Sequence, residues 1–550
     1  MALEANDKLN PFQTYPSTLP PGFINGCLQY RLSVMTPRMI PSSGVQNPYL
    51  DAWLPVSMNS PMLFNALLFS SLTHKRTHAL LTTENPTNFI DQDDSLLLLC
   101  QQETISRTNQ ALGHRASAVA DSTILAVVMM TETVNTSIIQ NRHWTGESPF
   151  KPPLQGLQWL NIHGARVPNM SHQAGLCKLV ALKGGLQNIL IPGAASAIFY
   201  RALVNSTLTL SQPQLPFFSV YRHENADMGS YFGPDSALFN DGVHEFQQYG
   251  LPPNLAYVLQ GMKAYSDSIR KYIDGETGIY DTRPMCDMRN LVHYHVMALP
   301  AGNELSVSQT NILYEACRLA SIIYSVGVLF PIPYVGSPLQ QLAVLLEREL
   351  SGKELLECFS VPEQDYKVNV VLWILTMGGI AATHTAERPW FVQKLAELRN
   401  RASICEWSEF RALLRSFPWL GCACDSAGER IWEEIEIEIS TSKPRAPPEE
   451  KNEVLRNHRY SSRPQPCVDC SRRRVKCDKK MPCQNCVRLR LSCSYKSART
   501  GQTDANQTGV GRTHACELCR RRKVKCDGRS PCGGCMALGS SCTNNLDSSR

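Results

Sequence analysis

Twelve of the chain's 21 cysteines form two groups of six near the C-terminus, and both groups have the same spacing, Cys-x2-Cys-x6-Cys-x5-Cys-x2-Cys-x6-Cys. Two cysteines separated by two residues place two thiolates on one metal ion, and structural zinc takes four such ligands in a tetrahedron. The repeat therefore predicts two metal-binding modules. Their ligands are Cys467, Cys470, Cys477, Cys483, Cys486 and Cys493 in module 1, and Cys516, Cys519, Cys526, Cys532, Cys535 and Cys542 in module 2.

The number of ligands leaves two arrangements open. Six thiolates can serve one zinc ion with two sulfurs left over, or two zinc ions if two sulfurs bridge them. Only the second arrangement uses every cysteine, and neither module contains a histidine, since His514 precedes module 2. The cations between the cysteines offset the negative charge of the thiolates and favour their ionised form.

A run of cations lies between the second and third cysteines of each module. Lys and Arg side chains bind phosphates, and they also pair with the O6 and N7 acceptors that guanine presents in the major groove. We therefore expect these runs to contact DNA. The residues are Arg472, Arg473, Arg474 and Lys476 in module 1, and Arg520, Arg521, Arg522, Lys523 and Lys525 in module 2.

The charge of the chain is divided unevenly. Residues 451–550 contain 22 Lys and Arg against 7 Asp and Glu, a net charge of +15, whereas the whole chain carries only +6 and residues 1–450 therefore carry −9. A strongly basic segment on an acidic body indicates a polyanionic partner for that segment.

Two observations place the chain in a reducing compartment. The N-terminus has no apolar signal segment, and the longest apolar run, Val368 to Thr383, is too short to span a bilayer. We therefore expect a soluble intracellular protein without a membrane partner. Thiols stay reduced there, so the clustered cysteines are predicted to bind metal instead of forming disulfides.

The two modules resemble the fungal Zn2Cys6 binuclear cluster, and the likeness extends beyond the cysteines. An aspartate follows the third cysteine and a proline precedes the fourth in both modules. The resemblance implies two Zn²⁺ per cluster and four per chain, with the first cysteine of each half opening a short helix. It also implies two bridging sulfurs in each cluster, Cys467 with Cys483 and Cys516 with Cys532.

The same resemblance implies a function. Members of this family are nuclear transcription regulators that read CGG-like triplets in double-stranded DNA, using a Lys four residues after the second cysteine. Lys523 occupies this position in module 2, whereas module 1 has Arg474, which also pairs with guanine. The basic runs are also suited to nuclear import.

The rest of the chain is predicted to be mainly α-helical, a large regulatory domain followed by two small zinc modules. Ser60-Pro61 is a helix start signal, and Leu63, Leu67, Leu68 and Leu72 follow at helical spacing. Stretches such as Asn47–Leu50 and His172–Leu186 resemble the regulatory domain of fungal Zn2Cys6 factors, which implies a surface for transcription co-regulators. The predicted segments are a poorly ordered 1–46, the helical domain 47–440, a linker 441–466, cluster 467–493, a flexible linker 494–515, cluster 516–542 and a tail 543–550.

Two features depart from the family pattern. The clusters are paired and lie at the C-terminus, and no heptad repeat follows them, so their tandem arrangement is predicted to replace dimerisation. As a flexible coil, the 22-residue spacer spans roughly 26 Å, which lets one chain engage two triplets. Oligomeric state stays open.

Two other functions are alternatives to sequence-specific transcription regulation. The first is a protein-interaction regulator whose zinc modules supply only non-specific DNA affinity. The second is an enzyme with appended zinc modules, which we disfavour because the chain has neither a Gly-x-Ser-x-Gly elbow nor a phosphate-binding Gly-x4-Gly-Lys-Ser/Thr loop.

Overall fold

The computed structural model describes residues 15–39, 47–82, 94–134, 147–219, 228–232, 236–276, 282–305, 313–351, 365–442, 467–473, 475–478, 480, 482–489 and 536. The chain divides into two compact units, Met1–Ala446 and Pro447–Arg550. The described residues are mainly helical, as predicted, and their one sheet is a two-residue antiparallel pairing of β1 (Glu132–Thr133) with β2 (Val167–Pro168). No helix among them is long and apolar enough to cross a membrane.

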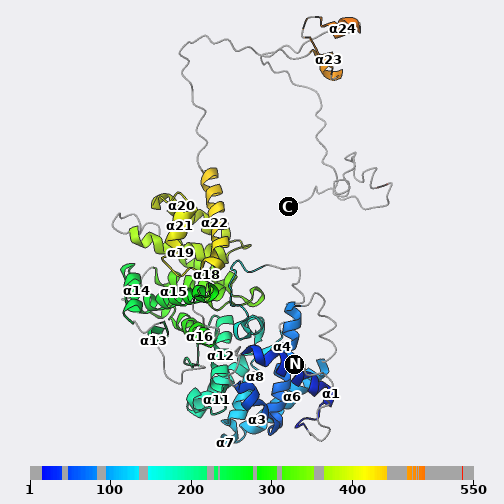
Figure 1. The fold of residues 1–550 in the computed structure, drawn as a ribbon, viewed down its shortest axis with the longest axis vertical. Helices are drawn as coiled ribbons and strands as arrows, with labels where there is room; N and C mark the ends of the chain where they lie inside the picture. The colour runs from blue at the N-terminus through cyan, green and yellow to red at the C-terminus, as the bar shows by residue number, and fades with distance from the viewer. Residues whose placement is uncertain are drawn as a thin grey trace, which may run out of the picture. The chain divides into compact units, whose positions relative to one another are not determined.

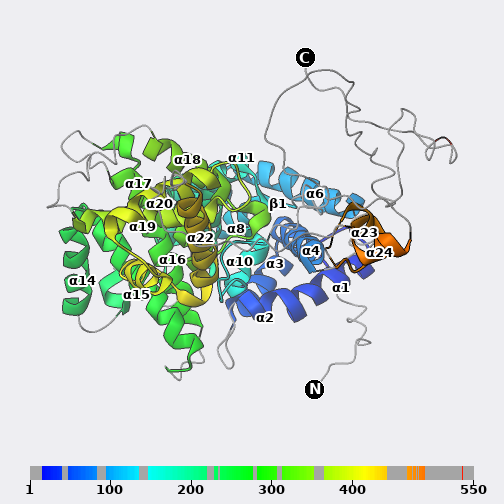
Figure 2. The same cartoon turned by 90° about the horizontal axis from the view of Figure 1, so that it is seen from above.

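One end of the first unit is built from helices of the N-terminal third (Figures 1 and 2). These elements are α1 (Pro21–Tyr30), η1 (Arg31–Met35), α2 (Thr36–Met39), η2 (Tyr49–Trp53), α3 (Leu54–Met58), α4 (Pro61–Thr82), α6 (Asp94–Leu112), α7 (Arg115–Ala118) and α8 (Asp121–Met129). Helices η4 (Leu157–Trp159), α10 (Leu160–His163), α11 (Met170–Lys183), η5 (Leu186–Asn188) and α12 (Ala194–Leu208) follow.

The remaining helices form the other end of this unit. They are α13 (Met228–Phe232), α14 (Ser236–Gln248), α15 (Pro253–Ile273), α16 (Arg283–Ala298), η6 (Gly302–Glu304), α17 (Tyr314–Tyr324), η7 (Ser325–Leu329), η8 (Tyr334–Gly336), α18 (Leu339–Ser351), α19 (Asp365–Ala381), α20 (Arg388–Ala402), α21 (Trp407–Leu414) and α22 (Gly421–Ser442).

Two central helices follow the sequence signals. Helix α4 begins at Pro61, and the Ser60 hydroxyl accepts a hydrogen bond from the Leu63 backbone N–H at 3.3 Å, so the predicted cap is confirmed. Helix α19 carries Trp373, which is fully buried and donates its indole N–H to the Pro418 carbonyl at 3.1 Å. Because a Cβ at Gly378 would lie 2.3 Å from the Phe391 ring, glycine there allows α19 and α20 to pack closely.

The N-terminal segment differs from its prediction. Residues 1–46 were expected to be poorly ordered, but Pro21–Met39 is helical, and Ile24 and Met35 are each only 1% exposed. The Met35 carbonyl accepts a hydrogen bond from the Trp159 indole at 2.8 Å. The prolines and asparagines of this segment suggested disorder, whereas the apolar residues at helical spacing bind it to the core.

A buried carboxylate connects three elements of the first unit. Glu132 at β1 is 2% exposed and its Oε2 accepts hydrogen bonds from Arg166 at 3.0 Å and from Arg201 of α12. His163 Nδ1 lies 3.2 Å from the same oxygen. Burial alone would raise the pKa of Glu132, but the two guanidinium groups and His163 hold that pKa well below its usual value.

We predict that Glu132→Gln destabilises the first unit by about 3–5 kcal/mol, because it leaves two buried guanidinium groups without their carboxylate. Urea unfolding of the full chain, followed by circular dichroism, measures the change. Glu433→Gln is the matched control, because Glu433 is an exposed residue of α22, and we expect it to change stability by less than about 0.5 kcal/mol. Equal unfolding midpoints for the two variants would contradict the assigned role of Glu132.

Candidate zinc cluster

Four cysteine sulfurs of module 1 lie close enough together to hold a metal ion. The Sγ atoms of Cys467, Cys470, Cys477 and Cys483 all lie within 4.8 Å of one another. The fifth cysteine, Cys486, places its Sγ 3.6 Å from that of Cys467. Cys493 and all six cysteines of module 2 fall outside the described residues.

The distances between these sulfurs fit zinc. Sulfurs bound tetrahedrally at about 2.3 Å from one zinc ion are about 3.8 Å apart, whereas disulfide sulfurs are about 2.05 Å apart. The observed Sγ–Sγ distances are 3.7 Å for Cys467–Cys483 and 3.5 Å for Cys470–Cys483. The donor set is therefore spaced for metal coordination and not for disulfide bonding.

Two short helices position the sulfurs. Helix α23 (Val468–Arg473) follows Cys467, and α24 (Gln484–Arg488) follows Cys483; the two lie side by side (Figure 2). The sulfur of each of these two cysteines accepts a hydrogen bond from the backbone N–H three residues later. The Cys470 N–H lies 3.5 Å from the Cys467 sulfur, and the Cys486 N–H lies 3.4 Å from the Cys483 sulfur. Cys467 and Cys483 therefore occupy equivalent positions at the two helix N-termini, where the helix dipole favours negative charge.

The surroundings shift the pKa values of two thiols in opposite directions. The backbone N–H of Cys470 is the main cause that lowers the pKa of Cys467, to about 6. Burial raises the pKa of Cys470 to about 12, and the adjacent thiols add to this effect. Zinc binds the thiolate form of cysteine, so coordination of a metal ion would release the protons that these thiols carry.

Two polar residues hold the halves of module 1 together, and sequence reasoning gave neither of them a role. The Asp478 carboxylate accepts from the Gln484 backbone N–H at 3.2 Å, which satisfies a donor at the start of α24. The Asn485 side-chain amide donates to the Lys476 carbonyl at 2.7 Å. The Asp478 signal was visible as an aspartate repeated in both modules, whereas the Asn485 contact requires the folded structure.

The predicted DNA-contacting residues that the structure describes are at the surface. Arg472 and Arg473 end α23 and Lys476 follows it, and all three are exposed. Arg474 and the basic run of module 2, from Arg520 to Lys525, lie outside the described residues.

The comparison with protein families identifies these segments. Residues 465–502 and 514–550 each match the fungal Zn(2)-Cys(6) binuclear cluster domain. The chain thus carries two zinc-cluster DNA-binding domains, and the predicted resemblance of both modules is confirmed. Domains of this kind support a role for the chain as a DNA-binding transcription regulator. Neither the curated proteins nor the solved structures include a match to the chain.

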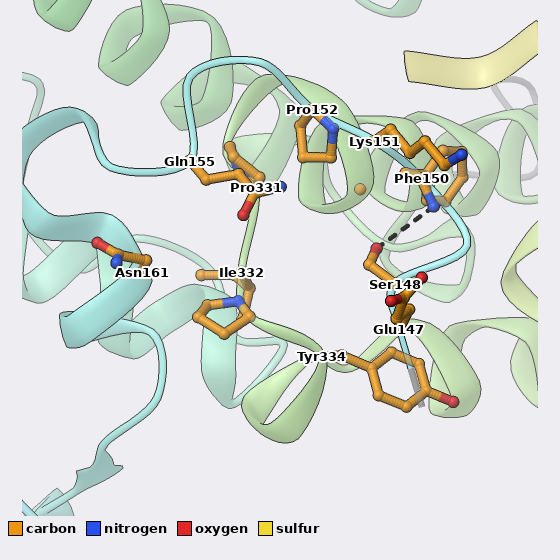
Figure 3. A pocket seen from close by; sticks show the side chains of 12 residues that line it. Glu147, Ser148, Phe150, Lys151, Pro152, Gln155, Asn161, Pro331, Ile332 and Tyr334 are labelled. Atoms are coloured by element: carbon orange, nitrogen blue, oxygen red, sulfur yellow. Dashed lines mark hydrogen bonds between the residues drawn. The ribbon is translucent and has the colours of Figure 1, made fainter. Parts of the chain in front are cut away.

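The helical unit contains a separate pocket of about 420 Å³ (Figure 3). The segment Glu147–Gln155 forms one wall and Pro331–Tyr334 the other, with Asn161 between them. Buried Phe150 also lines the pocket, and its ring lies 2.3 Å from the position a Cβ on Gly327 would take. Glu147 and Lys151 are the only charged side chains among the described lining residues.

We predict that Asp478→Ala lowers the stability of the zinc-loaded module by about 1 kcal/mol, because the Gln484 N–H at the start of α24 loses its acceptor. Chelator competition on the full chain measures this as a roughly fivefold loss of zinc affinity. Asp478→Asn is the control, since its side-chain oxygen still accepts the bond, and most of the affinity should remain. An equal loss in the two variants would assign the effect to the charge of Asp478 and not to capping.

Proposed function

We propose that this protein is a nuclear, sequence-specific DNA-binding transcription regulator that reads two CGG-like triplets through its two zinc clusters. The observation that carries the proposal is the sulfur cluster of module 1, whose spacing fits zinc and which presents Arg472, Arg473 and Lys476 at the surface. Both the sulfur cluster and the exposed cations are needed, because the metal folds the module and the cations bind the DNA.

All twelve clustered cysteines are proposed as zinc ligands, with two ions per cluster and four per chain. In module 1 the sulfur of Cys467 lies 3.7 Å from Cys483 and 3.6 Å from Cys486, and Cys483 also lies 3.5 Å from Cys470. Cys467 and Cys483 thus lie close to sulfurs of both the first three and the last three cysteines of module 1. This connectivity supports two tetrahedra that share the Cys467–Cys483 edge.

The base-reading residues are proposed to be Arg474 in cluster 1 and Lys523 in cluster 2. Each is the fourth residue after the second cysteine of its module. Arginine pairs with guanine O6 and N7 through two donors, and lysine contacts the same acceptors as a single charge. The other cations of each run bind phosphates and fix the orientation of the module on the duplex. These are Arg472, Arg473, Lys476, Arg520, Arg521, Arg522 and Lys525.

The helical unit is proposed to be the regulatory domain, with a surface for transcription co-regulators. Its support is the order of family-like stretches in the sequence and a helical fold with a core of its own. Binding of both clusters by one chain would raise the effective concentration of the second cluster at its triplet, without requiring a dimer.

The bridging assignment predicts the number of ions lost in each variant. We expect native mass spectrometry of the full chain to show four zinc ions. Cys467→Ala should remove two, because its sulfur serves both ions of cluster 1, whereas Cys477→Ala should remove only one. Loss of the same number of ions in both variants would refute the shared edge.

Selection from a random duplex library with the zinc-loaded full chain tests the reading of DNA. We expect two CGG-like triplets at a preferred spacing, and Arg474→Ala and Lys523→Ala should each cost about 1–3 kcal/mol and relax preference at one triplet. Arg472→Ala should weaken all sequences alike and reduce the salt dependence by about one ion. No enriched sequence at full zinc occupancy would favour a protein-interaction regulator with non-specific DNA affinity.

A further inference from the structure

The two clusters of this chain differ in sequence at the position of Asn485, whose side chain contacts the basic run of cluster 1. We infer that Asn485 is a positioning residue that fixes the DNA-reading run of cluster 1 in advance, and that cluster 2 lacks this device. Cluster 1 then anchors the chain on DNA, and cluster 2 adapts to the second triplet. The inference rests on the proposed function, because it concerns how the same two clusters share the reading of DNA.

Two hydrogen bonds hold the last residues of the basic run of cluster 1. The Val475 N–H donates to the carbonyl of Cys470, the residue that ends the Cys-x2-Cys pair before the run, at 3.1 Å. At the end of the run, the Asn485 amide donates to the Lys476 carbonyl at 2.7 Å. Asn485 belongs to α24, on the opposite half of the module, so this bond connects the reading run to the second zinc-binding helix. A segment ordered before binding loses less conformational entropy on the DNA.

The equivalent position in cluster 2 has no side chain. The identical cysteine spacing aligns Asp478 with Asp527 and Pro482 with Pro531, so both modules have the same residue types at these positions. The same alignment places Gly534 opposite Asn485, and Gly533 precedes it. Glycine has no side-chain amide and therefore cannot make the hydrogen bond that Asn485 makes in cluster 1.

The charges beyond the fourth cysteine differ in the same sense. Cluster 1 carries Arg488, exposed at the end of α24, and Arg490 two residues later. Cluster 2 has Ala537 and Gly539 at these positions. Cluster 1 therefore offers phosphate-binding groups in both halves, whereas cluster 2 depends mainly on its basic run. Stronger phosphate binding and a fixed reading run both assign the anchoring role to cluster 1.

The experiment uses the zinc-loaded full chain and three variants. Asn485→Ala removes the amide and retains a good helix former, and Gln484→Ala removes a neighbouring exposed amide as the matched control. Gly534→Asn supplies the missing amide to cluster 2. Affinity is measured on duplexes that keep one triplet and scramble the other, with the triplets assigned through Arg474→Ala and Lys523→Ala. Zinc content and salt dependence are recorded for every variant.

We expect Asn485→Ala to weaken binding to the cluster 1 triplet by up to about tenfold, with zinc content and salt dependence unchanged, and Gln484→Ala to have no effect. Gly534→Asn should strengthen binding to the cluster 2 triplet by a few-fold. Zinc loss in Asn485→Ala would overturn the inference, because the residue would then support the metal site alone. Unchanged affinity with full zinc content would overturn it as well.

A second measurement separates this inference from the proposed function. In the DNA-free, zinc-loaded chain, amide hydrogen exchange should be slower in peptides covering 471–476 than in those covering 520–525, and Asn485→Ala should remove the difference. Equal exchange in the two wild-type segments would overturn the inference even if both triplets are read. A clear difference without any preferred DNA sequence would leave the positioning role intact and refute only the proposed function.

Discussion

The DNA-binding part of this chain depends on the edge formed by two sulfurs, Cys467 and Cys483, 3.7 Å apart. Each sulfur stands at the N-terminus of a short helix and accepts a backbone N–H from that helix. Helices of five or six residues are unstable alone, because so few internal hydrogen bonds cannot offset the cost of nucleation. Zinc bound by these cysteines would therefore stabilise α23 and α24, and through them the polar contacts of Asp478 and Asn485.

The zinc site was predictable from sequence because its information is local. Six cysteines at fixed intervals, repeated once, leave little freedom in what they bind, and the family match at residues 465–502 and 514–550 confirms the interpretation. The contact between Asn485 and Lys476 was not predictable, since nothing in the sequence indicates which carbonyl a surface asparagine meets. Comparing the two modules position by position would have marked the asparagine as different, but only the structure gives the difference a physical meaning.

In the helical unit, too, features set by neighbouring residues were predictable, whereas contacts between residues far apart in the sequence were not. The cap at Ser60 and the buried run around Trp373 follow from spacing and residue type. The helical structure of Pro21–Met39 was not predicted, because the prediction rested on the average composition of the segment. Its fold depends instead on the packing of particular residues such as Ile24 and Met35 against the core. The pairing of Glu132 with Arg166 and Arg201 joins residues 34 and 69 positions apart, which no local pattern indicates.

The buried residues in the described part of module 1 are all cysteines: Cys467, Cys470, Cys483 and Cys486. The described residues of this module thus form no hydrocarbon core, and bound zinc would be the main source of its stability. The helical unit has an extensive apolar core of its own and does not share this dependence. Removal of zinc should thus abolish DNA binding by the zinc modules, while the helical unit stays folded. Zinc would then stabilise the smaller unit of the protein, whereas an apolar core stabilises the larger one.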